Sequence, residues 1–161
     1  MPDLVETLIE DDRWQQAGLE QLAETACRAA LAALGIDPSA HEIALLACGD
    51  ARISVLNADF RDKATATNVL SWPTEDLGAQ TEGGAPLTPQ ETELGDIAIS
   101  FDTCQREAEI QRKSFGDHVT HLLVHGCLHL LGYNHVSDKD AALMEGLEVS
   151  ILAKLGIADP Y

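Results

Sequence analysis

The segment HLLVHGCLHLLGYNH, residues 121–135, holds four of the six histidines of this 161-residue chain in an otherwise apolar setting. An imidazole is costly to leave unpaired among apolar side chains, so this concentration indicates either a dense hydrogen-bond network or a metal site. Residues four apart project from one face of a helix, which makes His125 and His129 neighbouring ligands. Gly132 is placed to end that helix in the left-handed conformation, and the reversed chain can bring His135 back toward the same face.

Three converging imidazoles with an open fourth position are the layout of a catalytic zinc site rather than a structural one. The spacing therefore predicts His125, His129 and His135 as ligands of one zinc ion, with nickel or another divalent transition metal as an alternative. The competing interpretation is a set of core histidines bonded to backbone carbonyls. His121 lies one turn before His125, and three roles agree with this position: ligand, support for the site or core residue. We expect one of the last two. The other two histidines are expected at the surface or in helix caps: His41 and His118.

The same spacing, with a glycine at the turn, occurs in metzincin proteases as H-E-x-x-H-x-x-G-x-x-H. Those enzymes use the glutamate after the first histidine as a general base. Gly126 occupies that position here, and it cannot transfer a proton. Peptide hydrolysis by this route is therefore disfavoured, whereas another hydrolysis at an open metal site agrees with the sequence.

The composition, with 45% hydrophobic and 23% charged residues, indicates one globular domain over residues 1–161. The net charge of −17 argues against broad adhesion to nucleic acid or anionic lipid. No apolar run approaches the ~20 residues that a bilayer requires, and the acidic N-terminal stretch is unlike a signal peptide. We therefore expect a cytoplasmic protein with no membrane partner. The cysteines show no C-x-x-C pairing and are expected as buried free thiols: Cys27, Cys48, Cys104 and Cys127.

Strand and helix patterns alternate in the first half of the chain, and helices dominate the second half. Strands are predicted over residues 5–9, 42–48, 68–73 and 94–100. Helices are predicted over residues 14–34, 50–61, 102–113, 117–131 and 138–155, with Asp50 as an N-cap and Ser137 and Asp140 as a capping box. A long loop spans residues 74–93. This order favours an α+β fold, in which a small mixed sheet of about four strands is covered by helices and carries a metalloprotease-like three-histidine site on a helix and the following turn.

Three stretches resemble the YbeY family of metal-dependent bacterial endoribonucleases, which are rRNA maturation factors. HGCLHLLGYNH, residues 125–135, resembles the family motif H-G-x-L-H-L-x-G-Y-D-H. LNADFRDKATATNVLSWP, residues 56–73, resembles the segments N-x-x-F-R and T-D-V-L-S-F-P, and LGDIAIS, residues 94–100, resembles the L-G-D-I strand. The histidine motif is specific and the others corroborate it. The motifs run in the family's order from residue 56 to 135 and the flanking helices fit the family's length, so the resemblance covers nearly the whole chain.

The resemblance implies a metal-dependent endoribonuclease specific for single-stranded RNA, acting in maturation of the 16S rRNA 3′ end and in ribosome quality control. Its expected partners are rRNA, the small ribosomal subunit and assembly factors, without DNA. It also implies that the metal ligands are His125, His129 and His135 and that His125 and Arg61 are catalytic. An arginine suits this chemistry because its planar fork binds two phosphate oxygens and stabilises charge that grows in the transition state.

Two departures from the family pattern concern asparagines. Asn134 stands where the family motif has an aspartate beside the last histidine, and Asn68 stands for the aspartate of T-D-V-L-S. An amide brings no charge to raise the basicity of a ligand, so either metal affinity is lowered or these positions serve only as caps. Asp96 of the L-G-D-I stretch is expected to orient a ligand histidine or to anchor a turn. A basic cleft beside the histidines is expected from Arg52, Arg61, Lys63, Arg106, Arg112 and Lys113.

Two other functions agree with the same residues. One is a metallopeptidase of metzincin-like geometry whose base comes from elsewhere, for example from the acidic loop 74–93. The other is a non-enzymatic ribosome-assembly factor in which the metal is structural.

Overall fold

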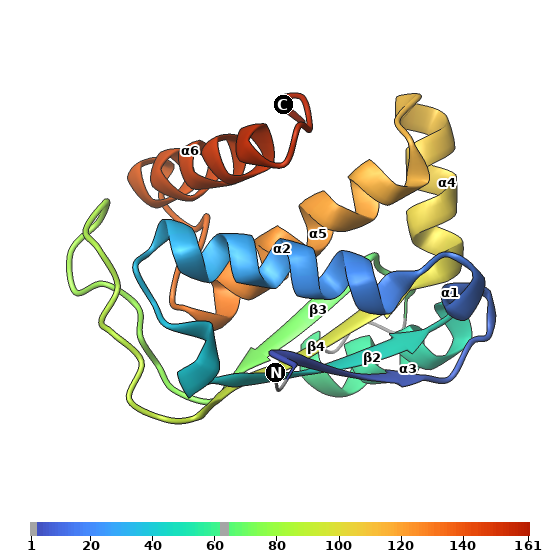
Figure 1. Ribbon diagram of the computed structural model, residues 1–161, viewed down its shortest axis with the longest axis horizontal. Coiled ribbons are helices and arrows are strands. Elements are labelled where there is room, and N and C mark those ends of the chain that lie inside the picture. The colour runs from blue at the N-terminus through green and yellow to red at the C-terminus, as the bar shows by residue number, and fades with distance from the viewer. Residues whose placement is uncertain (1–2, 62–64) are drawn as a thin grey trace.

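A four-stranded sheet forms the base of the structure (Figure 1). The computed structural model describes residues 3–61 and 65–161, with the side chains of Phe60 and Arg61 left out. The strands are β1 (Val5–Ile9), β2 (Glu42–Cys48), β3 (Val69–Pro73) and β4 (Glu93–Ser100). Their spatial order is β1-β2-β4-β3, in which β1, β2 and β4 run parallel and β3 runs antiparallel to β4. The predicted mixed sheet of four strands is confirmed.

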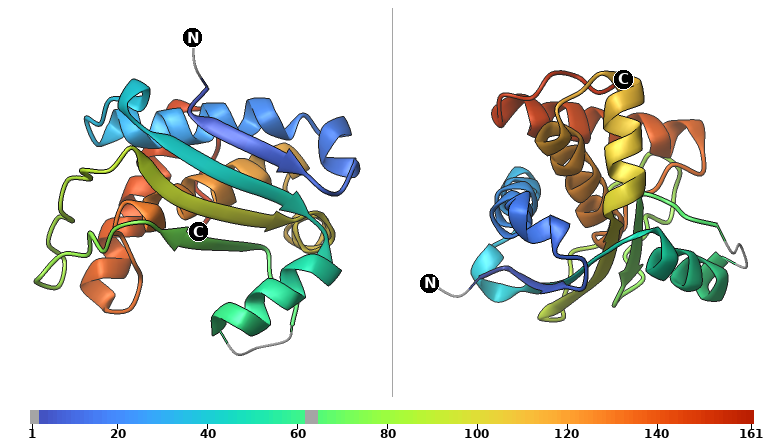
Figure 2. Two further views of the ribbon diagram at one scale, coloured as in Figure 1. Left: turned by 90° about the horizontal axis from the view of Figure 1, so that it is seen from below. Right: turned by 90° about the vertical axis from the view of Figure 1, so that its right-hand side faces the viewer.

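The helices lie mainly on one side of this sheet. They are α1 (Arg13–Gln16), α2 (Leu19–Ala33), α3 (Asp50–Arg61), α4 (Phe101–Gln111), α5 (Phe115–Leu130) and α6 (Asp138–Lys154), with a 3-10 turn at Pro38–Ala40. Helices α2 and α5 cover one face and α6 lies outside them, whereas α3 covers only one end of the opposite face (Figure 2). Among the described helices, none combines the length and the apolar character needed to cross a bilayer.

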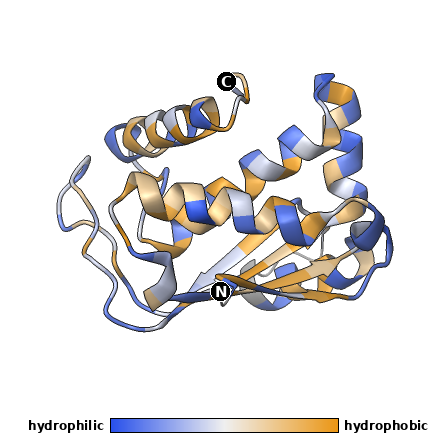
Figure 3. Ribbon diagram, in the orientation of Figure 1, coloured by the Kyte–Doolittle hydropathy of each residue, from blue (hydrophilic) through white to orange (hydrophobic). Residues whose placement is uncertain are grey.

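The main core lies between the sheet and helices α2 and α5, where apolar residues gather on the facing sides (Figure 3). Side chains alternate between the faces of a strand, so Ile97 and Ile99 of β4 point into this core while Ala98 packs on the α3 side. Buried residues of α5 meet them from above, among them Leu123 and Cys127. Helix α5 is therefore held firmly along the length that carries its histidines. All four cysteines are buried and free, as predicted.

Two helix starts differ from prediction. The expected single helix over residues 14–34 is divided between α1 and α2 by Gly18, which adopts a left-handed backbone (φ 71°). The break turns α1 so that fully buried Trp14 donates from Nε1 to the Cys48 carbonyl oxygen at 2.9 Å. Asp50 lies inside α3 rather than capping it, because its carboxylate accepts hydrogen bonds from Ser100 Oγ and Thr103 Oγ1. Of the capping box predicted for α6, the Ser137 half is confirmed: Ser137 Oγ accepts from the Asp140 backbone N–H, and the Asp140 carboxylate accepts from the Ser137 hydroxyl.

The turn after α5 depends on a glycine. Gly132 has φ 99°, and the backbone N–H groups of Gly132 and Tyr133 bond to the carbonyls of His129 and Leu128 in a Schellman arrangement. A Cβ on Gly132 would lie 2.7 Å from the carbonyl carbon of Leu77, a buried residue of the 74–93 loop. Any side chain here would therefore meet both backbone strain and a steric clash.

We expect Gly132→Ala to lower the free energy of unfolding by about 1–3 kcal/mol, because the left-handed backbone is strained for alanine and its methyl meets Leu77. Urea unfolding followed by circular dichroism measures this change. The matched control is Gly146→Ala in α6, where an added Cβ meets nothing within 4 Å and helix propensity favours alanine by about 1 kcal/mol. Equal stability of the two variants would contradict the role given to the turn.

Candidate metal centre

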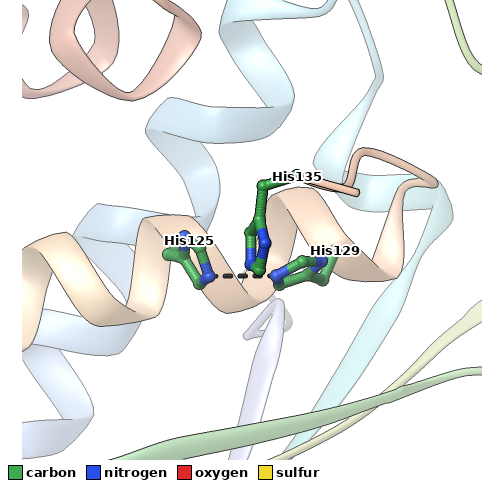
Figure 4. Close-up of side chains that lie close together, drawn as sticks. All are labelled: His125, His129 and His135. Carbon is green, nitrogen blue, oxygen red and sulfur yellow. Dashed lines mark hydrogen bonds between the residues drawn. The ribbon is translucent and has the colours of Figure 1, made fainter. Parts of the chain in front are cut away.

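Helix α5 and the turn after it bring three histidines together (Figure 4). His125 and His129 project from successive turns of α5, and the chain that returns after Gly132 places His135 beside them. One ring nitrogen from each residue lies within 4.8 Å of the other two. The ring centroids of His129 lie 4.5 Å from His125 and 5.2 Å from His135. The predicted convergence of the three imidazoles is confirmed.

The hydrogen bonds behind two of these rings determine which nitrogen faces the centre. His125 Nδ1 lies 3.0 Å from Glu148 Oε1, and His129 Nδ1 lies 3.0 Å from the Tyr133 carbonyl oxygen. A carboxylate and a carbonyl can only accept, so each Nδ1 is assigned the proton and each Nε2 presents a lone pair. The two Nε2 atoms face each other at 2.9 Å. Two lone pairs at this distance repel unless a cation or a proton lies between them, so the donor set fits a metal.

The protonation of His129 also suits a metal ligand. Burial, together with the neighbouring His125, lowers the pKa of His129 to about 4. At neutral pH the His129 ring is therefore uncharged. A histidine must be neutral to bind a metal. Since His129 is already neutral, metal binding requires no deprotonation of this ring.

A buried glutamate of α6 supports the histidines. Glu148 is fully buried, and its Oε1 accepts from His125 Nδ1 at 3.0 Å and from His121 Nε2 at 2.8 Å. Its Oε2 accepts from the Tyr161 hydroxyl at 2.8 Å. Burial alone would raise the pKa of Glu148, but the hydrogen bonds from the histidines and the tyrosine outweigh it and lower the pKa to about 2. The carboxylate is therefore charged at neutral pH and increases the basicity of His125.

The sequence analysis missed Glu148, although the sequence carries a signal for it. Residues 144, 148, 151 and 152 follow the spacing of one helix face, and three of the four are apolar: Met144, Ile151 and Leu152. A glutamate in such a stripe must be buried with it, and a buried carboxylate needs donors. The histidine cluster is the obvious source of those donors.

The other histidines divide between confirmed and corrected predictions. His121 supports the site by donating a hydrogen bond to Glu148, which confirms one of its expected roles. His118 was expected at the surface or in a cap, which is wrong: it is buried, and its Nε2 lies 2.9 Å from Glu107 Oε1. Its position on the core side of α5, one turn before Leu122, explains the burial. His41 lies outside the core and pairs with the Glu91 carbonyl oxygen at 2.9 Å.

The histidines open into a hollow of about 280 Å³. Beside the four histidines of residues 121–135, it is lined by Thr67, Asn68, Val69, Ser71, Leu122 and Tyr161. His129 also borders a neighbouring hollow of about 560 Å³, which the loop residues Glu75 and Asp76 line from the other side. Among the described residues, neither an acidic nor a basic side chain other than histidine lines the smaller hollow.

The two asparagines have different surroundings. Asn134 Oδ1 accepts from the Val136 backbone N–H at 3.0 Å, so this residue caps the turn that leads into α6. Asn68 Nδ2 donates to Glu107 at 3.1 Å, and Asn68 Oδ1 accepts from the Val69 N–H at 2.6 Å. An aspartate at position 68 would place its carboxylate against that of Glu107, and the two negative charges would repel each other. The asparagine amide avoids this repulsion and donates a hydrogen bond to Glu107 instead. No described bond joins either asparagine to His125, His129 or His135.

The remaining predicted site residues lie elsewhere or are not described. Arg61 is the last residue of α3, and its side chain, like all of Lys63, lies outside the described residues. Asp96 was expected to orient a ligand histidine or anchor a turn, which is wrong: the next residue of β4, Ile97, enters the core, and Asp96 is exposed on the opposite face of the sheet. Strand alternation explains this placement.

The described basic residues do not form the expected cleft beside the histidines, since none of them lines the hollow. Arg52 pairs with Glu10 at 3.4 Å, and Arg106 pairs with Asp50 at 2.8 Å. Lys113 donates to the Pro160 carbonyl oxygen at 3.2 Å.

Comparison with known proteins agrees with this geometry. The family model described as Endoribonuclease YbeY matches residues 5–156. The protein named Endoribonuclease YbeY from Ruegeria pomeroyi is 60% identical over 158 residues, which cover 95% of this chain and 94% of the relative. Its namesake from Paracoccus denitrificans is 55% identical over 161 residues, covering 100% of this chain and 91% of the relative. The solution structure of TM1509 from Thermotoga maritima shares the fold, with a TM-score of 0.56 at 17% identity over 97% of each chain. The chain therefore belongs to the Endoribonuclease YbeY family.

Proposed function

We propose that this protein is a metal-dependent endoribonuclease that cleaves single-stranded RNA at the three-histidine centre. Family membership supports the nuclease activity, because the relatives that match over nearly the whole chain are named endoribonucleases. The observation that carries the metal dependence is the meeting of His125 and His129 Nε2 lone pairs beside His135. Action on the 16S rRNA 3′ end, ribosome quality control, small-subunit partners and a cytoplasmic location are parts of this proposal that rest on the motif resemblance.

In this proposal His125, His129 and His135 hold one divalent ion, zinc or alternatively nickel. When bound, such an ion supplies a Lewis acid for phosphoryl oxygens and makes water more acidic. The protein's own residues orient the imidazoles from behind, through Glu148 at His125 and the Tyr133 carbonyl at His129. Glu148 lies in helix α6, and Tyr133 lies in the turn directly after α5. Because both acceptors are held by the fold, the imidazole rings are oriented before an ion binds.

The described lining of the histidine hollow does not provide the general base that peptide hydrolysis needs. A zinc peptidase needs a carboxylate base, and none lines the histidine hollow within the described part of the chain. Gly126, at the position where metzincins have that base, lies against Ile97 and Val69 of the sheet. The Glu75 carboxylate of the acidic loop accepts from the backbone N–H groups of Gln90 and Glu91, so it is committed to holding the loop.

His129→Ala is expected to abolish high-affinity zinc binding and RNA cleavage, because it removes one of the three ligands and one of the two facing lone pairs. Elemental analysis and cleavage of a single-stranded RNA measure the two effects, and treatment with a chelator should reproduce the loss. His41→Ala, far from the site, is the matched control for loss of an imidazole. Cleavage by His129→Ala at the wild-type rate would indicate a contaminating nuclease and contradict the proposal. Cleavage of casein that chelator blocks would support the peptidase instead.

Glu148→Gln is expected to weaken zinc binding by roughly 10–100-fold, the usual effect of losing a partner that orients a ligand histidine. The amide still fills the space but brings no charge to raise the basicity of His125. Competition with a chromophoric chelator measures the affinity. Glu145→Gln on the same helix is the charge-matched control, and equal affinities in the two variants would remove Glu148 from the site.

Arg61→Ala is expected to reduce RNA cleavage by about 10²–10³-fold, the effect of removing one group that stabilises transition-state charge, while zinc binding stays unchanged. Lysine at this position should recover only part of the activity, because it lacks the planar fork. Arg52→Ala, which removes a cation of the same helix that pairs with Glu10, is the control. Full function of Arg61→Ala in ribosome maturation, with unfolding when metal is removed, would favour the non-enzymatic assembly factor.

A further inference from the structure

Tyr161 lies at the histidine hollow although it is distant in sequence from every other residue there. Its hydroxyl donates to Glu148 Oε2 at 2.8 Å, and its ring stands edge-on to the His121 ring, with centroids 5.6 Å apart. The segment before it is tied in place from two sides. Lys113 of the turn after α4 donates to the Pro160 carbonyl at 3.2 Å, and the Tyr161 N–H donates to Asp159 Oδ1 at 2.8 Å.

The donors around Glu148 are divided between its two carboxylate oxygens. The two histidines share Oε1, and the tyrosine hydroxyl occupies Oε2. Without a partner at Oε2, this fully buried carboxylate could rotate so that its two oxygens face the remaining donors, His121 and His125, differently. Such a rotation would move Oε1 away from His125 Nδ1 and release the imidazole from its orientation. The hydroxyl therefore holds the carboxylate in the rotamer that serves His125.

We propose that Tyr161 is a positioning residue of the metal centre, which acts through Glu148 to hold His125 in the orientation that binds the ion. This inference rests on the proposed metal site and adds to it a residue that contacts no ligand histidine itself. Tyr161 as a whole is 61% exposed, so the effect depends on the hydroxyl bond rather than on burial of the side chain.

Three variants separate this role from others. Tyr161→Phe removes the hydroxyl and keeps the ring, whereas Tyr161→Leu removes both. Ser54→Ala removes a hydroxyl bond of similar length, 2.7 Å to the Asp50 carbonyl oxygen, on a helix away from the histidines. Zinc affinity is measured by competition with a chromophoric chelator, with zinc alone and no RNA present.

We expect Tyr161→Phe and Tyr161→Leu to weaken zinc binding to the same extent, by roughly tenfold, at the lower end of the effect of losing a partner behind a ligand. Ser54→Ala should bind zinc like the wild type. In the Glu148→Gln background, Tyr161→Phe should produce no further loss, because its path to the metal has already been removed. Additive losses in the double variant, or wild-type affinity in Tyr161→Phe, would overturn the proposal.

A second measurement does not depend on metal. The Nδ1 proton of His125 in the metal-free protein should exchange with solvent faster in Tyr161→Phe than in the wild type, as observed by NMR, and an unchanged rate would count against the proposal. If Tyr161→Leu alone lost RNA binding while Tyr161→Phe kept full zinc affinity, the ring would stack on a base and the positioning role would be wrong. Absence of RNA cleavage in every preparation, with the zinc effects intact, would reject the nuclease and leave the positioning role standing.

Discussion

The candidate site depends on the buried carboxylate of Glu148. Moving a charge into the interior costs several kcal/mol, which only well-placed donors can offset. Glu148 receives three, from His121, His125 and Tyr161, and its pKa near 2 shows that they more than compensate for burial. The requirement works in both directions. Helix α6 can bury Glu148 only where the α5 histidines meet it, and Glu148 in turn determines the tautomers of His121 and His125. The packing of α6 on α5 therefore also prepares the site.

The third imidazole depends on a different and more local constraint. His135 is brought back by the turn at Gly132, whose left-handed backbone and lack of a side chain let the 74–93 loop approach through Leu77. The same turn exposes the Tyr133 carbonyl to His129 Nδ1. One turn therefore delivers one histidine and orients another. The metal centre is thus assembled from a rigid helix, a turn that only glycine allows, and a charge supplied by a second helix.

Sequence reasoning succeeded where structure follows from local pattern. The four strands and the convergence of the histidines follow from short-range periodicity and from one glycine, so their prediction needed no tertiary information. It failed where contacts between segments distant in sequence determine the structure. The break at Gly18 lets Trp14 reach a buried partner at Cys48, and His118, on the core side of α5, finds its partner in Glu107 of α4. Glu148 and Tyr161 lie more than 20 residues from the ligands they serve, and only the packing of α6 and the following segment brings them there.

The charge of the chain bears on how RNA would be bound. A net charge of −17 repels a polyanion over most of the surface, so nonspecific electrostatic adhesion cannot supply the affinity. The described lining of the histidine hollow adds no basic side chain, and Asn68, Thr67 and Ser71 offer only uncharged hydrogen-bonding groups. In the nuclease that we propose, positive charge at the scissile phosphate would come from the ion and from Arg61, whose side chain lies outside the described residues. In the proposed nuclease, the ion would therefore contribute to substrate binding as well as to chemistry, which confines cleavage to strands that can reach the centre of the hollow.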